Sequence, residues 1–216
     1  MPPAIFITGT DTDVGKSVVA AMFTLGLGAS YWKPIQSGPG PVDETGASSQ
    51  GDRAYIQQLT GLPAAHFLPE RHCLSQPLSP HAAAAIDGIQ IQLSDFQLPR
   101  HDRAHLIVEG AGGLLVPLNP GGDYILDLIQ HLALPVVLVA RSGLGTLNHS
   151  LLSLERLRHS GIAVLGVVVN GPRNGSNCAA IAHYGQVPIL LELPPLQPLN
   201  AARLQQAFQS IRWPEA

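Results

Sequence analysis

The sequence predicts an α/β protein with a doubly wound, mostly parallel sheet and helices on both faces. Short β-rich runs alternate with helical patterns along the chain, which is typical of this class. Two of the runs, 136–139 and 167–169, are apolar from end to end, as expected of strands that are covered on both faces. The 216 residues are 45% hydrophobic and 12% charged, which is enough apolar material for one domain spanning residues 1–216.

The predicted strands are six runs of apolar and β-branched residues, at 4–8, 31–34, 106–109, 135–140, 164–170 and 187–191. Segments with helical periodicity lie between or after them, at 16–27, 53–60, 124–132, 147–160, 177–184 and 201–211. The stretch 37–49, rich in Gly, Pro and Ser, predicts a loop. Ligands bind at the carboxyl ends of the strands in such a sheet, so the residues that follow each strand are the candidate site.

Composition and charge narrow the classes of function. The net charge of −3 gives no reason to expect nucleic-acid binding. No run approaches 18 uninterrupted apolar residues, and no basic leader precedes the first strand. Cys73 and Cys178 lie far apart and form no C-x-x-C pair. We therefore expect a cytoplasmic protein with reduced cysteines and with neither a nucleic-acid nor a membrane partner.

The first candidate is the glycine-rich segment 9–17, Gly-Thr-Asp-Thr-Asp-Val-Gly-Lys-Ser, between the first strand and the first helix. The usual phosphate loop has four residues between its glycines, whereas five, two of them acidic, stand between Gly9 and Gly15. Such a turn offers backbone amides and a positive helix end to phosphate. Lys16 would then reach the terminal phosphates, and Ser17 would bind magnesium. The alternative is a chance match, which the flanking strand and helix argue against.

The second candidate is Lys33, at the end of the second predicted strand. The chain has ten arginines but only two lysines, Lys16 and Lys33, and both lie at the carboxyl ends of predicted strands. An ammonium group is a compact point charge, whereas a guanidinium is a broad planar fork. Lysine at these two places alone therefore favours a ligand role that needs the small cation over an ordinary solvated charge.

Polar residues also follow other strands. Glu109 ends a buried apolar strand and precedes the glycine-rich residues 110–113, so it is either a metal ligand beside phosphate or a cap for local amides. Asp52 ends the predicted loop and, taken alone, is best explained as a helix N-cap. Asn170 and Gly171 form either a turn or a base-facing amide.

A pair of histidines has the spacing of a zinc-binding helix. His101 and His105 are four residues apart, but aspartate stands where the metalloprotease motif has glutamate, and the segment leads directly into a strand. We therefore expect no zinc site here.

Five motifs, taken in order, resemble the ATP-dependent dethiobiotin synthetases, a family with the P-loop NTPase fold. They are GTDTDVGKS at 9–17, KPIQSG at 33–38, SPH at 79–81, VEGAGG at 108–113 and LGTLNH at 144–149. The longer phosphate loop is itself a mark of this family and of its amidotransferase relatives. The resemblance implies a ligase of biotin biosynthesis that works as a homodimer with ATP and Mg²⁺.

The reaction implied by the resemblance is a carboxylation that closes a ring. One amine of 7,8-diaminononanoate (7,8-diaminopelargonate) takes up CO2 as a carbamate, and a carbamate oxygen attacks the γ-phosphate of ATP. The other amine then attacks the carbamoyl carbon. This step closes the cyclic urea of dethiobiotin and releases phosphate, with ADP as the other product.

The resemblance also implies roles for individual residues. The ATP-binding residues would be Asp13, Val14, Gly15, Lys16, Ser17, Val18, Asp52, Glu109, Gly110, Ala111, Gly112, Asn170, Gly171, Leu193, Pro194 and Pro195. Within this set, Asn170 would read the adenine and Leu193, Pro194 and Pro195 would line the base pocket. Magnesium would be held by Ser17, Asp52 and Glu109. Lys33 matches the catalytic lysine, which would stabilise charge on the carbamate and γ-phosphoryl oxygens.

The substrate would be held at two ends. Thr12 and Ser37 would lie near the amines, and the family often has Glu where Asp13 stands, while Asp11 has no assigned role. The substrate carboxylate would bind to a helix end contributed by the neighbouring subunit, at Thr146, Leu147 and Asn148. The alternative for this helix end is an ordinary start with Thr146 as N-cap.

Two other functions share the predicted fold. A switch ATPase of the partitioning or septum-positioning type would carry an extra lysine early in the phosphate loop, where this chain has Thr10 and Asp11. An amidotransferase of the cobyrinic acid type would need a glutaminase domain with a nucleophilic cysteine, for which we expect no room in 216 residues.

Overall fold

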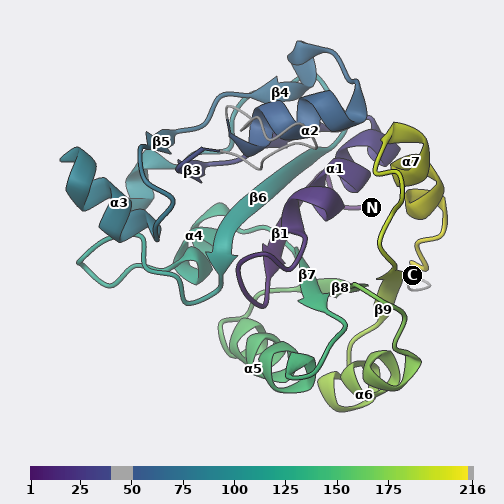
Figure 1. Ribbon diagram of the computed structural model, residues 1–216. Helices are drawn as coiled ribbons and strands as arrows, with labels where there is room; N and C mark the ends of the chain where they lie inside the picture. Colours follow the sequence, from purple (N-terminus) through teal and green to yellow (C-terminus); the bar gives the residue numbers. More distant parts are fainter. Residues whose placement is uncertain (40–50, 214–216) are drawn as a thin grey trace.

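A parallel sheet forms the centre of the molecule (Figure 1). The computed structural model describes residues 1–39 and 51–213. Seven strands pair in the order β4-β2-β6-β1-β7-β8-β9, and every pairing is parallel. They are β1 (Ala4–Gly9), β2 (Ser30–Trp32), β4 (Phe67–Leu68), β6 (Leu106–Gly113), β7 (Val136–Arg141), β8 (Val164–Asn170) and β9 (Ile189–Leu193). The prediction of a parallel sheet is confirmed, and β1 lies at its middle.

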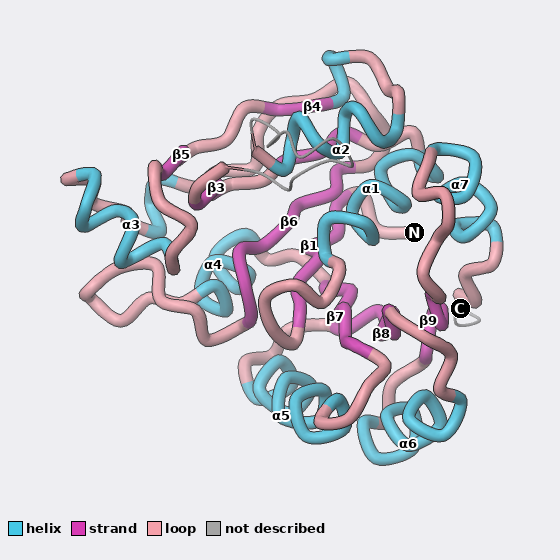
Figure 2. The backbone as a smooth tube through the Cα atoms, in the orientation of Figure 1, coloured by secondary structure: helices cyan, strands magenta, loops and turns pink. Residues whose placement is uncertain are grey.

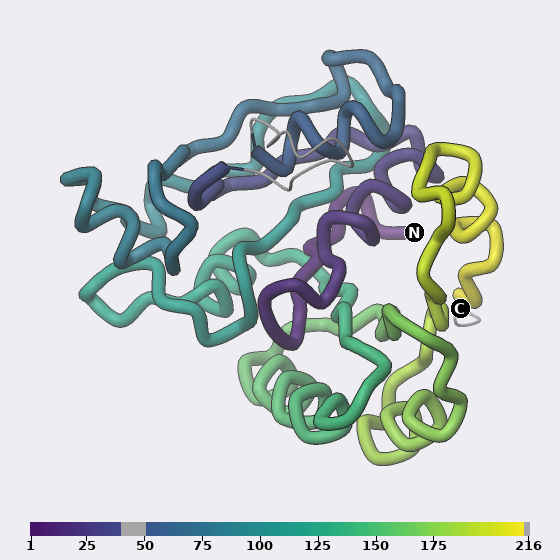
Figure 3. Tube along the Cα trace, viewed as in Figure 1, coloured from purple at the N-terminus to yellow at the C-terminus, as the bar shows by residue number. Residues whose placement is uncertain are grey.

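Helices cover both faces of this sheet, as predicted. One face carries α1 (Lys16–Leu27), α2 (Asp52–Thr60) and α7 (Ala201–Gln209), and the other carries α4 (Ile125–Leu132), α5 (Thr146–His159) and α6 (Gly175–Gly185). Figure 3 shows α7, near the end of the chain, beside α1, near its start. The rings of Phe23 and Phe208 meet edge to face there, with centroids 5.8 Å apart. Among the described helices, none has the length and apolar character needed to cross a membrane.

The apolar strands are explained by these two helix layers. Every residue of β1 is buried, and alternate side chains enter different cores: Phe6 belongs to the core on the α4 side, and Ile5 and Ile7 to the core on the α1 side. Burial on both faces needs an apolar residue at each position, so the alternation expected of a half-exposed strand is lost.

The second predicted strand ends early, which affects the site. Pairing of β2 with β6 stops at Trp32, and Lys33 and Pro34 connect β2 to a further strand, β3 (Ile35–Ser37). Proline has no N–H to donate to a ladder, which favours a break here. β3 pairs with β5 (His72–Leu74) in a small separate sheet, shown in Figure 2. The predicted loop therefore begins too early, at 37, and its residues 40–50 lie outside the described part of the chain.

Residues 61–105 contain elements that the sequence did not predict. They are β4, β5, α3 (Pro80–Asp87) and two 3₁₀ helices, Ala64–His66 and Leu93–Asp95. Two- and three-residue strands are too short to show a period of two, and α3 makes little more than two turns. Elsewhere the boundaries shift: β6 extends four residues beyond its predicted end, and β9 both begins and ends two residues later than predicted.

Candidate active site

The carboxyl ends of β1, β2 and β6 open onto one cavity of about 790 Å³. A volume of this size is ordinary for a small-molecule site. Many of the predicted site residues line it: Thr12, Asp13, Gly15, Lys16, Ser17, Val18, Lys33, Ser37, Asp52, Glu109, Ala111 and Gly112. The structure therefore brings the phosphate loop (residues 9–17) and the residues after β2 and β6 to one place, as the sheet edge predicted.

The phosphate loop is braced on its outer side by Asp11. This carboxylate accepts a hydrogen bond from the Thr12 amide (2.7 Å) through Oδ1 and pairs with the Arg141 guanidinium (2.7 Å) through Oδ2. Asp11 is not among the residues that line the cavity, so this acidic group does not face the phosphate position. Asp11, which has no assigned role in the sequence prediction, thus forms an ion pair with Arg141. The Arg141 guanidinium is in turn bound to the phosphate loop.

Lys16 lies on the inner side of the same loop. Its side chain is buried, and Nζ donates a hydrogen bond to the Asp11 backbone carbonyl (2.8 Å). Burial lowers the pKa of Lys16, and the negative charge of Glu109 only partly opposes that effect. Its ammonium group therefore has a neutral partner and would gain from a phosphate nearby.

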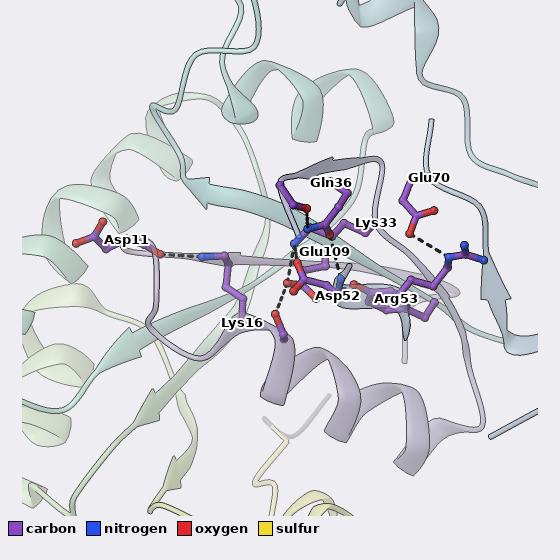
Figure 4. Close-up of polar contacts among 11 residues, drawn as sticks. Asp11, Lys16, Lys33, Gln36, Asp52, Arg53, Glu70 and Glu109 are labelled. Atoms are coloured by element: carbon purple, nitrogen blue, oxygen red, sulfur yellow. Dashed lines mark hydrogen bonds and ion pairs between the residues drawn. The ribbon is translucent and has the colours of Figure 1, made fainter. Parts of the chain in front are cut away.

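The opposite side of the cavity is acidic, with Glu109 at its centre (Figure 4). Glu109 is buried, and its Oε1 accepts hydrogen bonds from the Ser17 hydroxyl (2.8 Å) and the Lys33 ammonium (3.2 Å). The Tyr31 hydroxyl donates to Oε2 (2.9 Å). Lys33 also forms an ion pair with Asp52, so that its ammonium group bridges two carboxylates. We call Asp52 and Glu109 the acidic pair.

Asp52 is not the N-cap of α2. Gly51 occupies that position, and Asp52 is the first helical residue. The Asp52 amide donates to the Gln36 side-chain carbonyl (3.1 Å), and the Gln36 amide group donates in turn to the Gly38 carbonyl (3.1 Å). Because these bonds anchor the start of α2 to β3, the Asp52 carboxylate is directed to Lys33.

The acidic pair determines the charge state of Lys33. Burial by itself would lower the pKa of Lys33, but the negative charges of Glu109 and Asp52 and their hydrogen bonds outweigh it, and the pKa is raised. Lys33 is therefore a cation throughout the neutral range.

The donor atoms of this corner fit magnesium chemically. Ser17 and the acidic pair offer hydroxyl and carboxylate oxygens, the hard donors that Mg²⁺ prefers, and the hydroxyl is within 2.8 Å of Glu109. The described residues include no cluster of three or more His, Cys, Asp or Glu side chains that could hold a metal. Mg²⁺ commonly takes one or two carboxylates and completes its shell with phosphates and water. His101 and His105 lie outside any helix, so their spacing does not place them on one helix face.

The predicted base-binding residues do not line the main cavity, and one of them, Asn170, contacts the phosphate loop. Asn170 Nδ2 donates to the Val14 carbonyl (2.9 Å), and a Cβ on Gly15 would come within 2.1 Å of that nitrogen, so the loop needs glycine there. The Gly171 amide donates to the Leu193 carbonyl (2.9 Å), which joins β8 to β9. A separate cavity of about 380 Å³ is lined by Leu193, Pro194 and Pro195, among others. Of the remaining ATP-site predictions, Val14 is buried behind the loop and Gly110 packs on Phe6.

The start of α5 lies outside the main cavity. Gly145, at a φ of 89°, is the cap residue, and the Thr146 hydroxyl donates to the Arg141 carbonyl (2.5 Å). The interpretation of Thr146 as N-cap is therefore wrong. Within the described residues, the Leu147 and Asn148 amides have no backbone hydrogen-bond acceptor preceding the helix. Neither residue contacts the cavity of the same chain.

Several site residues were missed by sequence reasoning. Gln36 and Ser79 line the cavity, and both belong to quoted motifs that carried no assignment for them. Tyr55, on α2, also lines it. Tyr31 has no sequence signal, because a tyrosine within a predicted strand is normally a core residue.

The chain matches a family of known proteins over most of its length. A family model described as AAA domain matches residues 3–203. The chain is 45% identical over 210 residues to an ATP-dependent dethiobiotin synthetase BioD of Rhodopseudomonas palustris, covering 97% of this chain and 96% of that protein. The BioD of Bradyrhizobium diazoefficiens is 44% identical over 209 residues, with 97% and 95% coverage. The biotin biosynthesis bifunctional protein BioCD of Bordetella avium is 45% identical over 200 residues, and there this chain covers 41% of the longer protein.

Solved structures extend the likeness of fold to more distant proteins. The septum site-determining protein MinD from Pyrococcus horikoshii, complexed with Mg-ADP, superposes with a TM-score of 0.56 at 13% identity, over 97% of this chain and 94% of that one. The cell division ATPase MinD of Pyrococcus furiosus superposes with a TM-score of 0.52, also at 13% sequence identity, over 97% of this chain and 96% of that one. These two likenesses concern the fold alone, which is that of the P-loop NTPases. With two relatives at 44–45% identity over nearly their whole lengths, the chain belongs to the ATP-dependent dethiobiotin synthetase family.

Proposed function

We propose that the protein uses ATP and Mg²⁺ to carboxylate 7,8-diaminononanoate and close it to dethiobiotin. The observation that carries this proposal is the bridging of the acidic pair by Lys33 in the cavity that the phosphate loop also lines. One cavity thus holds a phosphate-binding loop, hard oxygen donors and a second cation, which phosphoryl transfer to a carbamate would need. Family membership supports the same reaction.

The phosphate loop would bind the nucleotide. Among the described residues, Lys16 has only a neutral carbonyl as its hydrogen-bond partner, so moving its ammonium to the β- and γ-phosphates exposes no buried carboxylate there. The amides at the start of α1 and the positive end of that helix would hold the remaining phosphate charge. Magnesium on Ser17 and the acidic pair would neutralise charge on the transferring phosphoryl group.

Lys33 would act on the transferring group. It must exchange the acidic pair for carbamate and γ-phosphoryl oxygens, so substrate binding has to open its ion pairs. Its raised pKa means that it carries a full charge to that position. A buried cation in a water-poor cavity stabilises charge that develops in the transition state far better than one in solvent.

The diamine would lie on the other side of the loop. Ser37 supports this placement, because its hydroxyl is buried, lines the cavity and has no hydrogen-bond partner among the described residues. Buried hydroxyl groups are normally hydrogen-bonded, so an amine or carbamate of the substrate would satisfy it. Thr12 and Asp13 also line this side. The longer loop would thus serve two ligands, phosphates and diamine.

The base would bind between Asn170, which contacts the loop, and the segment 193–195. Asn170 already donates one of its two amide hydrogens to Val14, so its carbonyl oxygen and its second amide hydrogen are the groups left for the edge of the base. Leu193, Pro194 and Pro195 would supply apolar contact to the ring from the second cavity.

A homodimer would complete the substrate site. The start of α5 does not line the cavity of its own chain, yet its Leu147 and Asn148 amides, which have no backbone acceptor among the described residues before the helix, suit a carboxylate. Large apolar side chains are exposed nearby: Leu144 fully, and Leu115 and Leu152 by 57% each. Leu115 and Leu152 line a common groove of about 300 Å³. A second copy on this face would cover them and bring its α5 towards the cavity.

The dimer has a direct test. Proline at Leu147 removes one amide donor but is tolerated in the first helical turn. The Leu147→Pro variant should have a raised KM for the diamine acid and a nearly unchanged KM for ATP. Sedimentation should show that the wild type and the variant are both dimers. A fully active monomer at assay concentration, or equal changes in both KM values, would refute the shared site.

The function itself is tested by ATP hydrolysis with and without the diamine plus bicarbonate. We expect hydrolysis to depend on both and dethiobiotin to accumulate in proportion to ADP. The alternative function, a switch ATPase, is favoured only by the fold likeness to MinD, and such an enzyme would ignore both additions. We further propose that residues 1–216 form one ATP-binding domain and that the protein acts in the cytoplasm, with small molecules and a second copy as its partners.

A further inference from the structure

On the acidic side of the cavity, the Glu109 carboxylate is contacted by Tyr31, which lies in the middle of β2. Tyr31 pairs with Phe67 of β4 and Ile107 of β6, and its side chain is completely buried. Its ring packs at a tilt on that of Phe67, with centroids 6.1 Å apart. A phenylalanine would meet all these packing needs, so the packing alone leaves the hydroxyl group unexplained.

Within the described residues, that hydroxyl has one hydrogen-bond partner, the Glu109 carboxylate. Its oxygen lies 2.9 Å from Oε2, while Oε1 accepts from Ser17 (2.8 Å) and Lys33 (3.2 Å). Among the described residues, Tyr31 is the only side chain that donates to Oε2. The two carboxylate oxygens therefore have different partners: Oε1 is bonded by two residues that line the cavity, and Oε2 by a residue of the central sheet.

The Tyr31 hydroxyl is the donor of this contact, and the Glu109 carboxylate oxygen is the acceptor. Without that hydroxyl, Oε2 would be a desolvated carboxylate oxygen with no donor, and the carboxyl group would be free to turn about its terminal bond.

We propose that Tyr31 is a positioning residue for the metal site, whose hydroxyl holds the Glu109 carboxylate with Oε1 turned towards Ser17 and the bound cation. The inference rests on the proposed role of Glu109 as a metal ligand. Partners that orient a ligand in this way commonly change metal affinity or activity by about 10- to 100-fold when they are removed. Tyr31 is not a catalytic residue, because it does not line the cavity.

The experiment compares Tyr31→Phe with Glu109→Gln and with the wild type. The probe is Mn²⁺ with the non-hydrolysable β,γ-imido analogue of ATP, and free Mn²⁺ is followed by electron paramagnetic resonance. Binding of the same analogue without metal is measured by calorimetry. Tyr184→Phe on α6 is the matched control, because it removes the same group from a side chain that is 69% exposed.

We expect Tyr31→Phe to weaken Mn²⁺ binding by about tenfold or more, with metal-free nucleotide affinity and the unfolding midpoint close to wild type. Glu109→Gln should weaken Mn²⁺ at least as much, and Tyr184→Phe should change neither measurement. If Glu109→Gln weakens Mn²⁺ but Tyr31→Phe stays within twofold of wild type, the positioning role is wrong and the metal assignment stands. If neither variant changes Mn²⁺ binding, both the positioning role of Tyr31 and the assignment of Glu109 as a metal ligand are wrong. Equal losses with and without metal would make Tyr31 a purely structural residue.

Discussion

The two sides of the cavity each hold one buried lysine, and the two lysines differ in their partners. Lys16, on the phosphate-loop side, is 7% exposed, and Lys33, on the acidic side, is 6% exposed. Burial is therefore nearly equal and does not explain why the pKa of Lys16 is lowered while that of Lys33 is raised. The difference comes from the groups that accept their hydrogen bonds: a neutral backbone carbonyl for Lys16 and two carboxylates for Lys33.

Because their partners differ, the two buried lysines have different roles. Lys16 is desolvated and has no ion-pair partner within the described part of the chain, so phosphate can bind to it without breaking an ion pair there. Lys33 compensates the acidic pair in the absence of ligand, so it contributes to the folded state as well as to the proposed chemistry. The same residue type therefore has one role on the loop side and two on the acidic side.

The largest expected effect is on stability. Lys33→Met should lower the free energy of unfolding by about 3–5 kcal/mol, because it leaves the acidic pair buried without a cation. Lys16→Met should change it by less than about 1 kcal/mol, since a lost hydrogen bond is offset by a removed desolvation cost. Urea denaturation at pH 7 measures both. Because the pKa of Lys33 is raised, its contribution is fully present below its ordinary value of 10.5 and is lost as the pH rises through the folded-state pKa.

A double variant checks the cause of that effect. Lys33→Met with Asp52→Asn removes a charge of each sign, so it should recover part of the stability lost in Lys33→Met alone. Equal losses in Lys16→Met and Lys33→Met would show that the acidic pair is not what distinguishes the two sides.

The next effect separates catalysis from stability on the acidic side. Lys33→Arg keeps the cation, so its stability should lie closer to wild type than that of Lys33→Met. Its turnover should nevertheless fall by an amount worth roughly 2.5–4 kcal/mol, because the guanidinium differs in size and geometry at the transferring group. Steady-state kinetics measures the turnover, and urea denaturation of the same preparation measures the free energy of unfolding. Turnover near the wild-type value would leave Lys33 only its structural role.

The third effect concerns the acidic pair itself. Asp52→Asn and Glu109→Gln should each raise the Mg²⁺ concentration for half-maximal activity by about tenfold or more, because each removes one anionic oxygen. Magnesium titration of activity is the measurement. Asp102→Asn, an exposed carboxylate outside the site, is the control. An unchanged magnesium dependence in both site variants would exclude these ligand assignments.

The smallest effect is on the loop side. The pair between Asp11 and Arg141 is exposed, with 53% and 43% of the two side chains accessible. Its coupling energy should be about 0.2–1 kcal/mol and should fall with added salt. A double-mutant cycle of Asp11→Asn and Arg141→Gln, followed by urea unfolding at low and high salt, measures it. A coupling of several kcal/mol that resists salt would place this pair in the same class as Lys33 and the acidic pair.

The loop side of the site was predictable from sequence because its parts are contiguous. Residues 9–17 carry the whole phosphate loop, and the apolar run before it and the helical pattern after it determine where it sits. Most of the acidic side was predicted only as separate residues. That Asp52 faces Lys33 depends on Gln36, which holds the start of α2, and no spacing along the chain indicates that contact.

The region 61–105 was missed for a different reason. Its strands have two or three residues each and its α-helix has eight. Neither the two-residue period of a strand nor the 3.6-residue period of a helix repeats often enough there to be recognised. These elements are held by contacts with distant parts of the chain, such as the pairing of β5 with β3. Local preference contributes little to elements of this length.

By itself, the sequence determined the parallel sheet, the helices on both faces and the place of the glycine-rich loop after the first strand, and it singled out the two lysines that line the cavity. These depend on period, composition and the order of residues within short segments, which are local properties of a chain. Only the tertiary structure decided that Asp52 pairs with Lys33, that Asp11 turns to Arg141 and that Tyr31 supports Glu109. Each of these contacts joins residues from different elements, and a side chain's partner and pKa are set by what the fold brings within a few ångströms of it.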